Sequence, residues 1–331
     1  MTELQVAPKD NLTSQIYEAL KTGYPCTSGS FGVVYRCTIK ASDGPIEVAV
    51  KVFKVDPGRG IEKNEKATRR ELMVWLRLND PTIVPLLGIA YIEPPFPALV
   101  SRWMPSGTLY TYIEEATTLS TSGRVALAKG VADGLMYLHS ENVIHGDLHP
   151  GNVLIDGSGN PRLTDFGLAT VVGDAELQLS STTASRALDP RWRAPEVIGM
   201  DHEYDPGRPT FKSDIYSFGG LMFFVISGDV PWKEKKPHQI YIELWKRANP
   251  ARPDNILDDY WDLIQRCWYW DPGDRPKAVE VFECIATKIT TTLGKTEMAE
   301  STIRTTPPEM ADRCIDFRCR LRRIFLITDA A

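Results

Sequence analysis

The stretch HGDLHPGNVLID, residues 145–156, constrains the fold of this chain more than any other segment. It sets Asp147 and Asn152 ahead of the apolar run VLI, which fits a short buried strand. The turn signal GSGN follows, and the next segment, LTDFG, brings another carboxylate, Asp165. We therefore expect the side chains of Asn152 and Asp165 to converge.

Length and composition indicate a globular protein with a large core. The 331 residues fit one large or two modest domains, and 43% hydrophobic with 24% charged residues is a usual globular profile. A net charge of −5 gives no reason to expect nucleic acid as a partner. The N-terminus lacks an apolar signal core, and the longest apolar stretch, LMFFVI, is too short to span a bilayer. We expect a monomer without a transmembrane segment.

Cysteine usage bears on the compartment. The six cysteines are scattered, with no CxxC pair and no histidine at zinc-like spacing. This pattern predicts free thiols in a reducing environment. We therefore expect a cytoplasmic protein.

The character of the sequence changes along the chain. Residues 1–22 are a lead-in with a short amphipathic piece around IYEAL, and a main domain is expected over 23–290. Its first part, 23–104, holds strand-like segments such as FGVVYRCTI and EVAVKVFKV and one helical pattern, IEKNEKATRRELMVWLRLN. Its second part, 105–290, is mainly helical, and the polar tail 291–331 is expected to be poorly ordered.

Phosphate-binding features begin with CTSGSFGVV, residues 26–34. Gly29 and Gly32 would let backbone amides approach an anion, although such glycines also fit an ordinary hairpin. In VAVK, Lys51 lies inside an apolar strand, where a charge must be paired or hold an anion unless it lies at an edge. Glu71, on the following helix, can supply the pairing carboxylate or lie on a solvated face.

The opening stretch adds the other groups that phosphoryl transfer needs. Asp147 can accept a proton from an attacking hydroxyl, or orient it. Asn152 and Asp165 offer oxygen ligands to Mg²⁺, which prefers hard donors. With Lys51 on phosphate oxygens, positioning and charge neutralisation supply most of this chemistry.

Six motifs in a fixed order carry a family resemblance. They are the Gly-rich loop, the VAVK lysine, the helix glutamate, HGDLHPGN, DFG at 165–167 and APE at 194–196. With this set the chain resembles a eukaryotic protein kinase over residues 24–290. The resemblance implies an α+β, two-lobed fold, with a five-stranded antiparallel sheet and one helix in the small lobe and a larger, mainly helical lobe. PRWRAPE and the paired CW and DP..RP signatures are most similar to the tyrosine-kinase-like group, and HGDL to its fungal members.

The resemblance also assigns roles to residues, with ATP and Mg²⁺ in the cleft. Asp147 would be the catalytic base, and Val34, Ala49 and Leu154 would enclose the adenine. Ser101 would guard the pocket behind it. The expected catalytic residues are Lys51, Glu71, Asp147, His149, Asn152 and Asp165, of which Asn152 and Asp165 would bind the metal. The expected nucleotide-binding residues are Cys26, Gly29, Ser30, Phe31, Gly32, Val34, Ala49, Lys51, Ser101, Arg102, Trp103, Met104, Leu154 and Asp165.

The motif HGDLHPGN also occurs in small-molecule kinases related to aminoglycoside and choline kinases. Downstream segments favour protein substrates instead: RWRAPEV, KSDIYSFG with Asp214 expected to hold the catalytic loop, and CWYWDPGDRP with Arg275 expected to pair with Glu196. We expect phosphorylation of protein Ser or Thr in signal transduction, with Tyr left open. A pseudokinase scaffold that binds nucleotide or partners without catalysis is the alternative.

Three positions depart from the family pattern. Thr27 replaces the first loop glycine, which predicts weaker nucleotide binding. Gly146 replaces the arginine that reads an activation-loop phosphate, so activity is expected not to depend on phosphorylation there. His149 replaces the lysine that steadies the transferring phosphoryl group, and a role for it would show as turnover that improves as the pH falls toward 6. The activation-loop hydroxyls concerned are those of Ser180, Ser181, Thr182, Thr183 and Ser185.

Overall fold

The computed structural model of the chain describes residues 11–21, 23–28, 32–54, 61–92, 96–115, 119–177, 189–200 and 208–288. Contacts within the chain define two units, Met1–Cys284 and Ile285–Ala331. The fold described below is that of the first unit.

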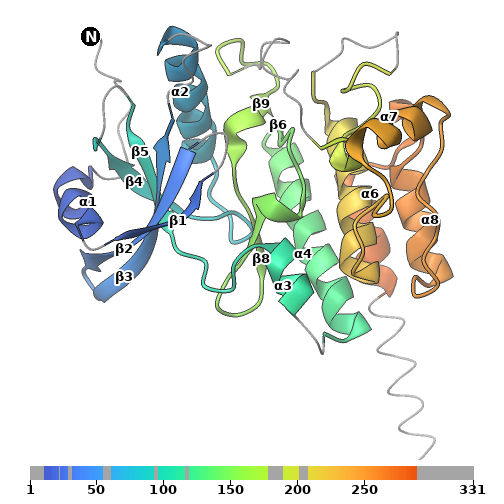
Figure 1. The fold of residues 1–331 in the computed structure, drawn as a ribbon, viewed down its shortest axis with the longest axis horizontal. Helices are drawn as coiled ribbons and strands as arrows, with labels where there is room; N and C mark the ends of the chain where they lie inside the picture. Colours follow the sequence, from blue (N-terminus) through green and yellow to red (C-terminus); the bar gives the residue numbers. More distant parts are fainter. Residues whose placement is uncertain are drawn as a thin grey trace, which may run out of the picture. The chain divides into compact units, whose positions relative to one another are not determined.

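The first part of this unit is a five-stranded sheet flanked by two helices (Figure 1). The strand order is β1-β2-β3-β5-β4, and every neighbouring pair is antiparallel. The elements are α1 (Thr13–Leu20), β1 (Tyr24–Ser28), β2 (Gly32–Ala41), β3 (Gly44–Phe53), α2 (Ile61–Arg77), β4 (Leu86–Ala90) and β5 (Ala98–Arg102).

Strand β3 shows how the two faces of the sheet are used. Val48 and Val50 are fully buried in a core that also holds Ile16 of α1. Because successive side chains of a strand point to opposite faces, Lys51 points away from this core. It meets Glu71 of α2 there. The alternation in VAVK thus buries the valines and delivers the lysine to α2.

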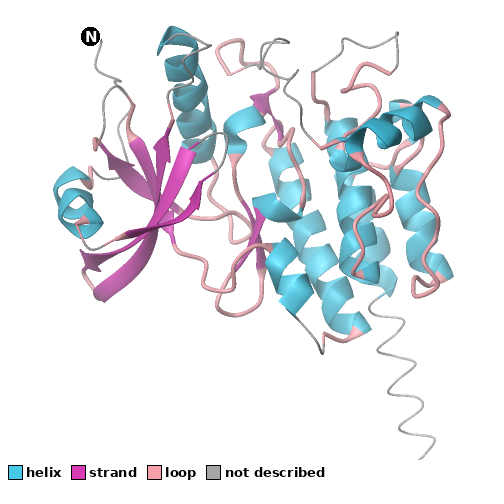
Figure 2. Cartoon of the chain, in the orientation of Figure 1, coloured by secondary structure: helices cyan, strands magenta, loops and turns pink. Residues whose placement is uncertain are grey.

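The second part of the unit is mainly helical (Figure 2). Helix α6 is apolar around most of its circumference because it packs against both α4 and α8. It begins with a capping box, in which Thr210 and Ser213 each bond the other's backbone amide. The helices are α3 (Leu109–Glu115), α4 (Thr121–Ser140), α6 (Phe211–Ser227), α7 (Pro237–Trp245) and α8 (Asp258–Cys267).

Short strands carry the loops that hold the polar motifs. The expected strand and turn around VLI and GSGN are confirmed, since β7 (Val153–Ile155) pairs with β8 (Pro161–Leu163). Asp156 closes this hairpin by accepting hydrogen bonds from the backbone amides of Ser158 and Asn160, each at 2.9 Å. A second short pair is formed by β6 (Val143–Ile144) and β9 (Thr170–Val171).

These pairings place HGDLHPGN between β6 and β7 and DFG between β8 and β9. Single turns of 3-10 helix follow in these loops and beyond: η1 (Pro150–Asn152), η2 (Phe166–Leu168), η3 (Pro190–Trp192) and η4 (Pro272–Asp274).

The expected α+β fold, with a five-stranded antiparallel sheet and a mainly helical second part, is confirmed. Within the part of the chain that the structure describes, no helix combines the length and apolar character needed to cross a bilayer.

Candidate active site

Lys51 lies between two carboxylates. Its Nζ is 2.7 Å from Glu71 Oε1 and 3.1 Å from Asp165 Oδ1. Burial alone would lower the pKa of Lys51, but the charges of Asp165 and Glu71 outweigh it and raise that pKa above the ordinary value. Burial would likewise raise the pKa of Asp165, whereas Lys51 lowers it. Both groups are therefore charged at neutral pH, and the expected pairing of Lys51 with Glu71 is present.

The DFG turn is fixed against α2. Asp165 has a left-handed backbone, with φ 62° and ψ 75°, and its carboxylate accepts a hydrogen bond from the Gly167 amide at 3.4 Å. Phe166 is fully buried, with its ring centroid 5.9 Å from that of Trp75. Arg70 donates from Nη2 to the Gly167 carbonyl at 2.5 Å. Neither Arg70 nor Trp75 stands out in the sequence, since either fits the face of an ordinary amphipathic helix.

A cavity of about 340 Å³ opens beside Lys51, and we call it the Lys51 cavity. The predicted nucleotide-binding residues that line it are Cys26, Val34, Ala49, Lys51, Ser101, Arg102, Trp103, Met104, Leu154 and Asp165. Predicted catalytic residues Glu71 and Asn152 line it too. Residues not predicted for it are Trp75, Leu99, Gly107, Thr108, Gly151 and Thr164. Strand alternation would have found Leu99, which shares a face of β5 with Ser101.

The Gly-rich segment is only partly described. Gly29, Ser30 and Phe31 lie outside the described residues. A Cβ added to Gly32 would lie 2.3 Å from the Val52 carbonyl oxygen, so the close approach of β3 by itself requires glycine there. The register of β1 against β2 shifts before Thr27. The activation-loop hydroxyls also lie outside the described residues.

Asp214 holds the backbone of the HGDL loop, as expected. Its carboxylate accepts hydrogen bonds from the amides of His145 at 2.8 Å and Gly146 at 2.9 Å. His139 Nε2 lies 3.0 Å from the same carboxylate. Asp214 is 1% exposed, so the loop is anchored to the buried first turn of α6.

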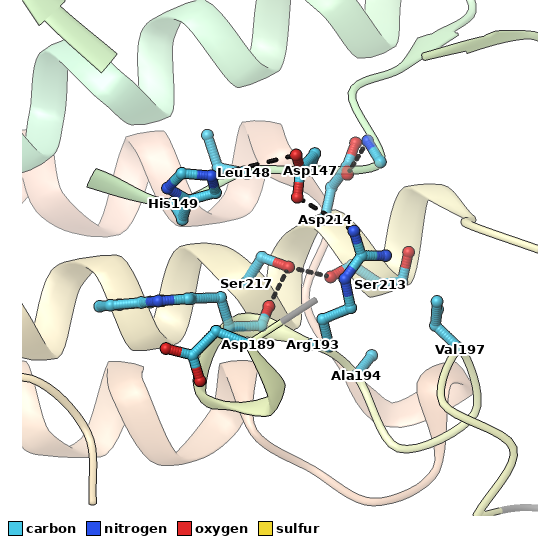
Figure 3. A pocket seen from close by; sticks show the side chains of 12 residues that line it. Asp147, Leu148, His149, Asp189, Arg193, Ala194, Val197, Ser213, Asp214 and Ser217 are labelled. Atoms are coloured by element: carbon cyan, nitrogen blue, oxygen red, sulfur yellow. Dashed lines mark hydrogen bonds and ion pairs between the residues drawn. The ribbon is translucent and has the colours of Figure 1, made fainter. Parts of the chain in front are cut away.

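Asp147 lies in a second cavity of about 280 Å³, which we call the Asp147 cavity (Figure 3). Asn152 Nδ2 donates to the Asp147 carbonyl at 2.9 Å and lies 3.3 Å from Oδ2. The other carboxylate oxygen, Oδ1, accepts a hydrogen bond from Arg193 Nη2 at 3.0 Å. Arg193 was not predicted to take part in the site.

His149 is neutral in this arrangement. Its Nδ1 accepts a hydrogen bond from the Gly151 amide at 3.1 Å, which places the ring proton on Nε2. Nε2 lies 3.9 Å from Asp147 Oδ2. Burial lowers the pKa of His149 more than the nearby Asp147 raises it. The side chain can therefore donate one hydrogen bond in this cavity but carries no charge at neutral pH.

Gly146 adopts a backbone conformation that other residues rarely do. Its φ is +75°, and an added Cβ would lie 2.6 Å from the Leu168 carbonyl oxygen and 3.1 Å from Pro209 Cγ. In sequence the position reads only as a missing arginine. The structure shows that glycine also relieves a strained and crowded turn.

A buried ion pair joins Glu196, which is adjacent to the cavity-lining Val197, to Arg275. Arg275 Nη1 and Nη2 lie 2.6 and 2.8 Å from the two carboxylate oxygens of Glu196, and Arg275 is 1% exposed. Arg275 Nε also donates to the Tyr269 carbonyl at 2.8 Å. The predicted pairing of Arg275 with Glu196 is confirmed.

The Lys51 cavity fits a nucleotide with its magnesium ion. Val34, Ala49 and Leu154 give it apolar walls suited to a flat ring, and the partly buried cation of Lys51 suits a polyphosphate. The Asn152 nitrogen is engaged with Asp147, which leaves the amide oxygen to a metal, and Asp165 adds a carboxylate. Two such protein ligands suit Mg²⁺, whose remaining positions phosphates and water fill.

Comparison with known proteins agrees with this arrangement. The family described as protein tyrosine and serine/threonine kinase matches residues 20–285. Serine/threonine-protein kinase STY46 of Arabidopsis thaliana is 30% identical over 269 residues, covering 80% of this chain and 43% of that protein. Serine/threonine-protein kinase CTR1 of Arabidopsis thaliana is 30% identical over 264 residues, covering 78% of this chain and 30% of that protein.

A tyrosine kinase is among the relatives as well. Tyrosine-protein kinase ABL2 of Mus musculus is 30% identical over 283 residues, covering 84% of this chain and 22% of that protein. The chain thus spans less than half the length of these relatives. The match over residues 20–285, together with the motifs and their geometry, shows that this chain belongs to the family of protein tyrosine and serine/threonine kinases.

Proposed function

We propose that this chain transfers the γ-phosphate of Mg·ATP to Ser or Thr hydroxyls of protein substrates. The observation that carries the proposal is the ion-pair cluster of Lys51 with Glu71 and Asp165, which lines a cavity with apolar walls. Asn152 links this cavity to the next, because it lines the first and donates to Asp147 in the second.

The proposed chemistry needs few groups. The acceptor oxygen forms a bond to the γ-phosphorus, the bond from that phosphorus to the bridging oxygen breaks, and ADP leaves. The hydroxyl proton passes to the carboxylate of Asp147. Lys51 would hold the α- and β-phosphate oxygens, with Glu71 fixing its position. When bound by Asn152 and Asp165, Mg²⁺ would neutralise charge on the phosphate oxygens.

Ser or Thr is proposed ahead of Tyr because STY46 and CTR1 are named as serine/threonine kinases, although ABL2 is a tyrosine kinase. PRWRAPE and the HGDL loop support a place in the tyrosine-kinase-like group, of the fungal type. We further propose a monomeric, cytoplasmic enzyme in signal transduction. The domain start expected at residue 23 also stays a proposal, and the burial of Ile16 against the sheet argues for an earlier one.

The test is transfer of labelled phosphate from [γ-³²P]ATP to the protein itself and to a generic protein substrate, followed by phosphoamino-acid analysis. We expect phosphoserine or phosphothreonine with the wild-type protein and none with Asp165→Asn. Phosphotyrosine alone would correct the specificity. A silent wild-type protein that still binds ATP would overturn the proposal in favour of a pseudokinase.

A further inference from the structure

The Asp147 cavity contains a cation that the sequence motifs do not predict. Among the described residues that line it, Arg193 is the one arginine or lysine. Figure 3 shows its guanidinium pointing at the carboxylate of Asp147, and the Nη2 to Oδ1 distance is 3.0 Å. The side chains are 7% and 11% exposed, so this pair is largely withdrawn from water. A pair in this setting interacts more strongly than one on the surface.

His149, two residues after Asp147 along the chain, gives no such charge. His149 Nδ1 accepts a hydrogen bond from the Gly151 amide, and a doubly protonated ring would have to break that bond. Its Nε2 is 3.9 Å from Asp147, beyond hydrogen-bonding distance. The positive charge beside this carboxylate therefore comes from the loop after η3, 46 residues farther along the chain.

The backbone that presents Arg193 is held in place. Ser217 of α6 donates from Oγ to the carbonyl of Trp192, the preceding residue, at 2.6 Å. Asp189 caps η3 by accepting from the Arg191 amide at 3.1 Å. α6 also carries Asp214, which anchors the HGDL loop. One helix thus fixes both partners of the Arg193–Asp147 pair, as a precisely positioned group requires.

We propose that Arg193 is a positioning residue for Asp147, which holds its carboxylate toward the acceptor hydroxyl and supplies the positive charge that position 149 lacks. The inference rests on the proposed function. It also implies that a cation at either position 193 or position 149 can stabilise the carboxylate of Asp147. Arg193 donates to Oδ1 and Asn152 lies at Oδ2, which fixes the carboxylate plane and leaves further lone pairs to accept the hydroxyl proton.

The test compares Arg193→Gln and Arg193→Met with Arg193→Lys, and then adds His149→Lys to each neutral variant. Both neutral variants should lower kcat by about tenfold or more while the KM for ATP stays the same, because Arg193 does not line the Lys51 cavity. Arg193→Lys should recover part of the loss. His149→Lys should also recover part of it, since its charge enters the same cavity from the other segment.

A matched control is Arg162→Gln. Arg162 pairs with Asp156 through Nε and Nη2 at 3.0 and 2.9 Å and lines neither cavity, so this variant should keep its kcat. Thermal unfolding of every variant identifies any that misfolds. If one of the two neutral variants misfolds, the other can still be measured.

Three results would overturn the inference. They are neutral variants that keep full turnover, neutral variants that gain turnover because Arg193 had blocked Asp147, and a loss that neither lysine reverses, as mere packing would give. A silent wild-type protein would overturn the proposed function and this inference with it, whereas an active one tests the inference alone.

Discussion

The partly buried Lys51 and the buried Arg193 are both cations paired to carboxylates, yet they belong to different cavities. In the Lys51 cavity, the cation and its partners Glu71 and Asp165 each stand in a recognisable motif. In the Asp147 cavity, the motif position for a cation holds His149, and the charge comes from Arg193 instead. A motif fixes which residue types occur within one segment, whereas the Arg193–Asp147 pair joins two segments whose contact no motif records.

The variant Asp147→Asn tests most directly whether the two cavities have different roles. If the two cavities divide binding from chemistry, this variant should lose about 10²–10⁴-fold in kcat, because the general base is gone. Its affinity for nucleotide should stay that of the wild-type protein, because Asp147 does not line the Lys51 cavity. Initial-rate kinetics and titration with a fluorescent ATP analogue measure the two quantities.

Lys51→Met is the matched comparison and should weaken nucleotide binding as well as kcat. It removes the cation next to the carboxylates of Glu71 and Asp165, which leaves their charges unbalanced. Equal nucleotide affinity in the two variants, or turnover retained by Asp147→Asn, would show that the cavities do not divide the work in this way.

The same contrast explains how far sequence reasoning could reach. The strand alternation in VAVK indicates the direction of Lys51, and the order of motifs pointed to its partner Glu71, because each depends on local periodicity or a fixed spacing. The contact of Lys51 with Asp165 was not predicted. Whether an arginine two residues before Pro195 turns toward Asp147 or toward solvent depends on the path of the backbone after η3. Nothing local in RWRAPE sets that direction. The fold was therefore predictable in outline, and the Lys51 cavity more fully than the Asp147 cavity.

Gly146 shows a second limit of the same kind. As a residue type it indicates only that an arginine is missing, and its backbone angle is invisible in the sequence. We expect Gly146→Ala to destabilise the protein by about 2–5 kcal/mol, since it adds left-handed strain to a close contact with the Leu168 carbonyl. Chemical denaturation monitored by tryptophan fluorescence measures the loss.

Gly173→Ala is the control for this prediction. Gly173 has a similar φ of +88°, but an added Cβ there would meet nothing within 4 Å. It should cost only the backbone strain, about 1–2 kcal/mol. Equal losses at the two positions would mean that the turn at Gly146 relaxes around a side chain, and the loop could then accept the family's arginine.

The smallest expected effect concerns pH. An imidazolium at position 149 would add charge to the Asp147 cavity and raise turnover as the pH falls. Burial lowers the pKa of His149, so the neutral form persists through the ordinary titration range near about 6.5 and protonation needs a lower pH. The cation of the Lys51 cavity does not titrate there either, because its carboxylate neighbours raise the pKa of Lys51.

We therefore expect kcat not to rise as the pH falls from about 7.5 to about 6.5, the ordinary pKa of histidine. His149→Gln should follow the wild-type profile over this interval, in kcat measured at saturating ATP. A wild-type rise that His149→Gln abolishes would show that His149 charges near neutrality, and would make it a second cation beside Arg193.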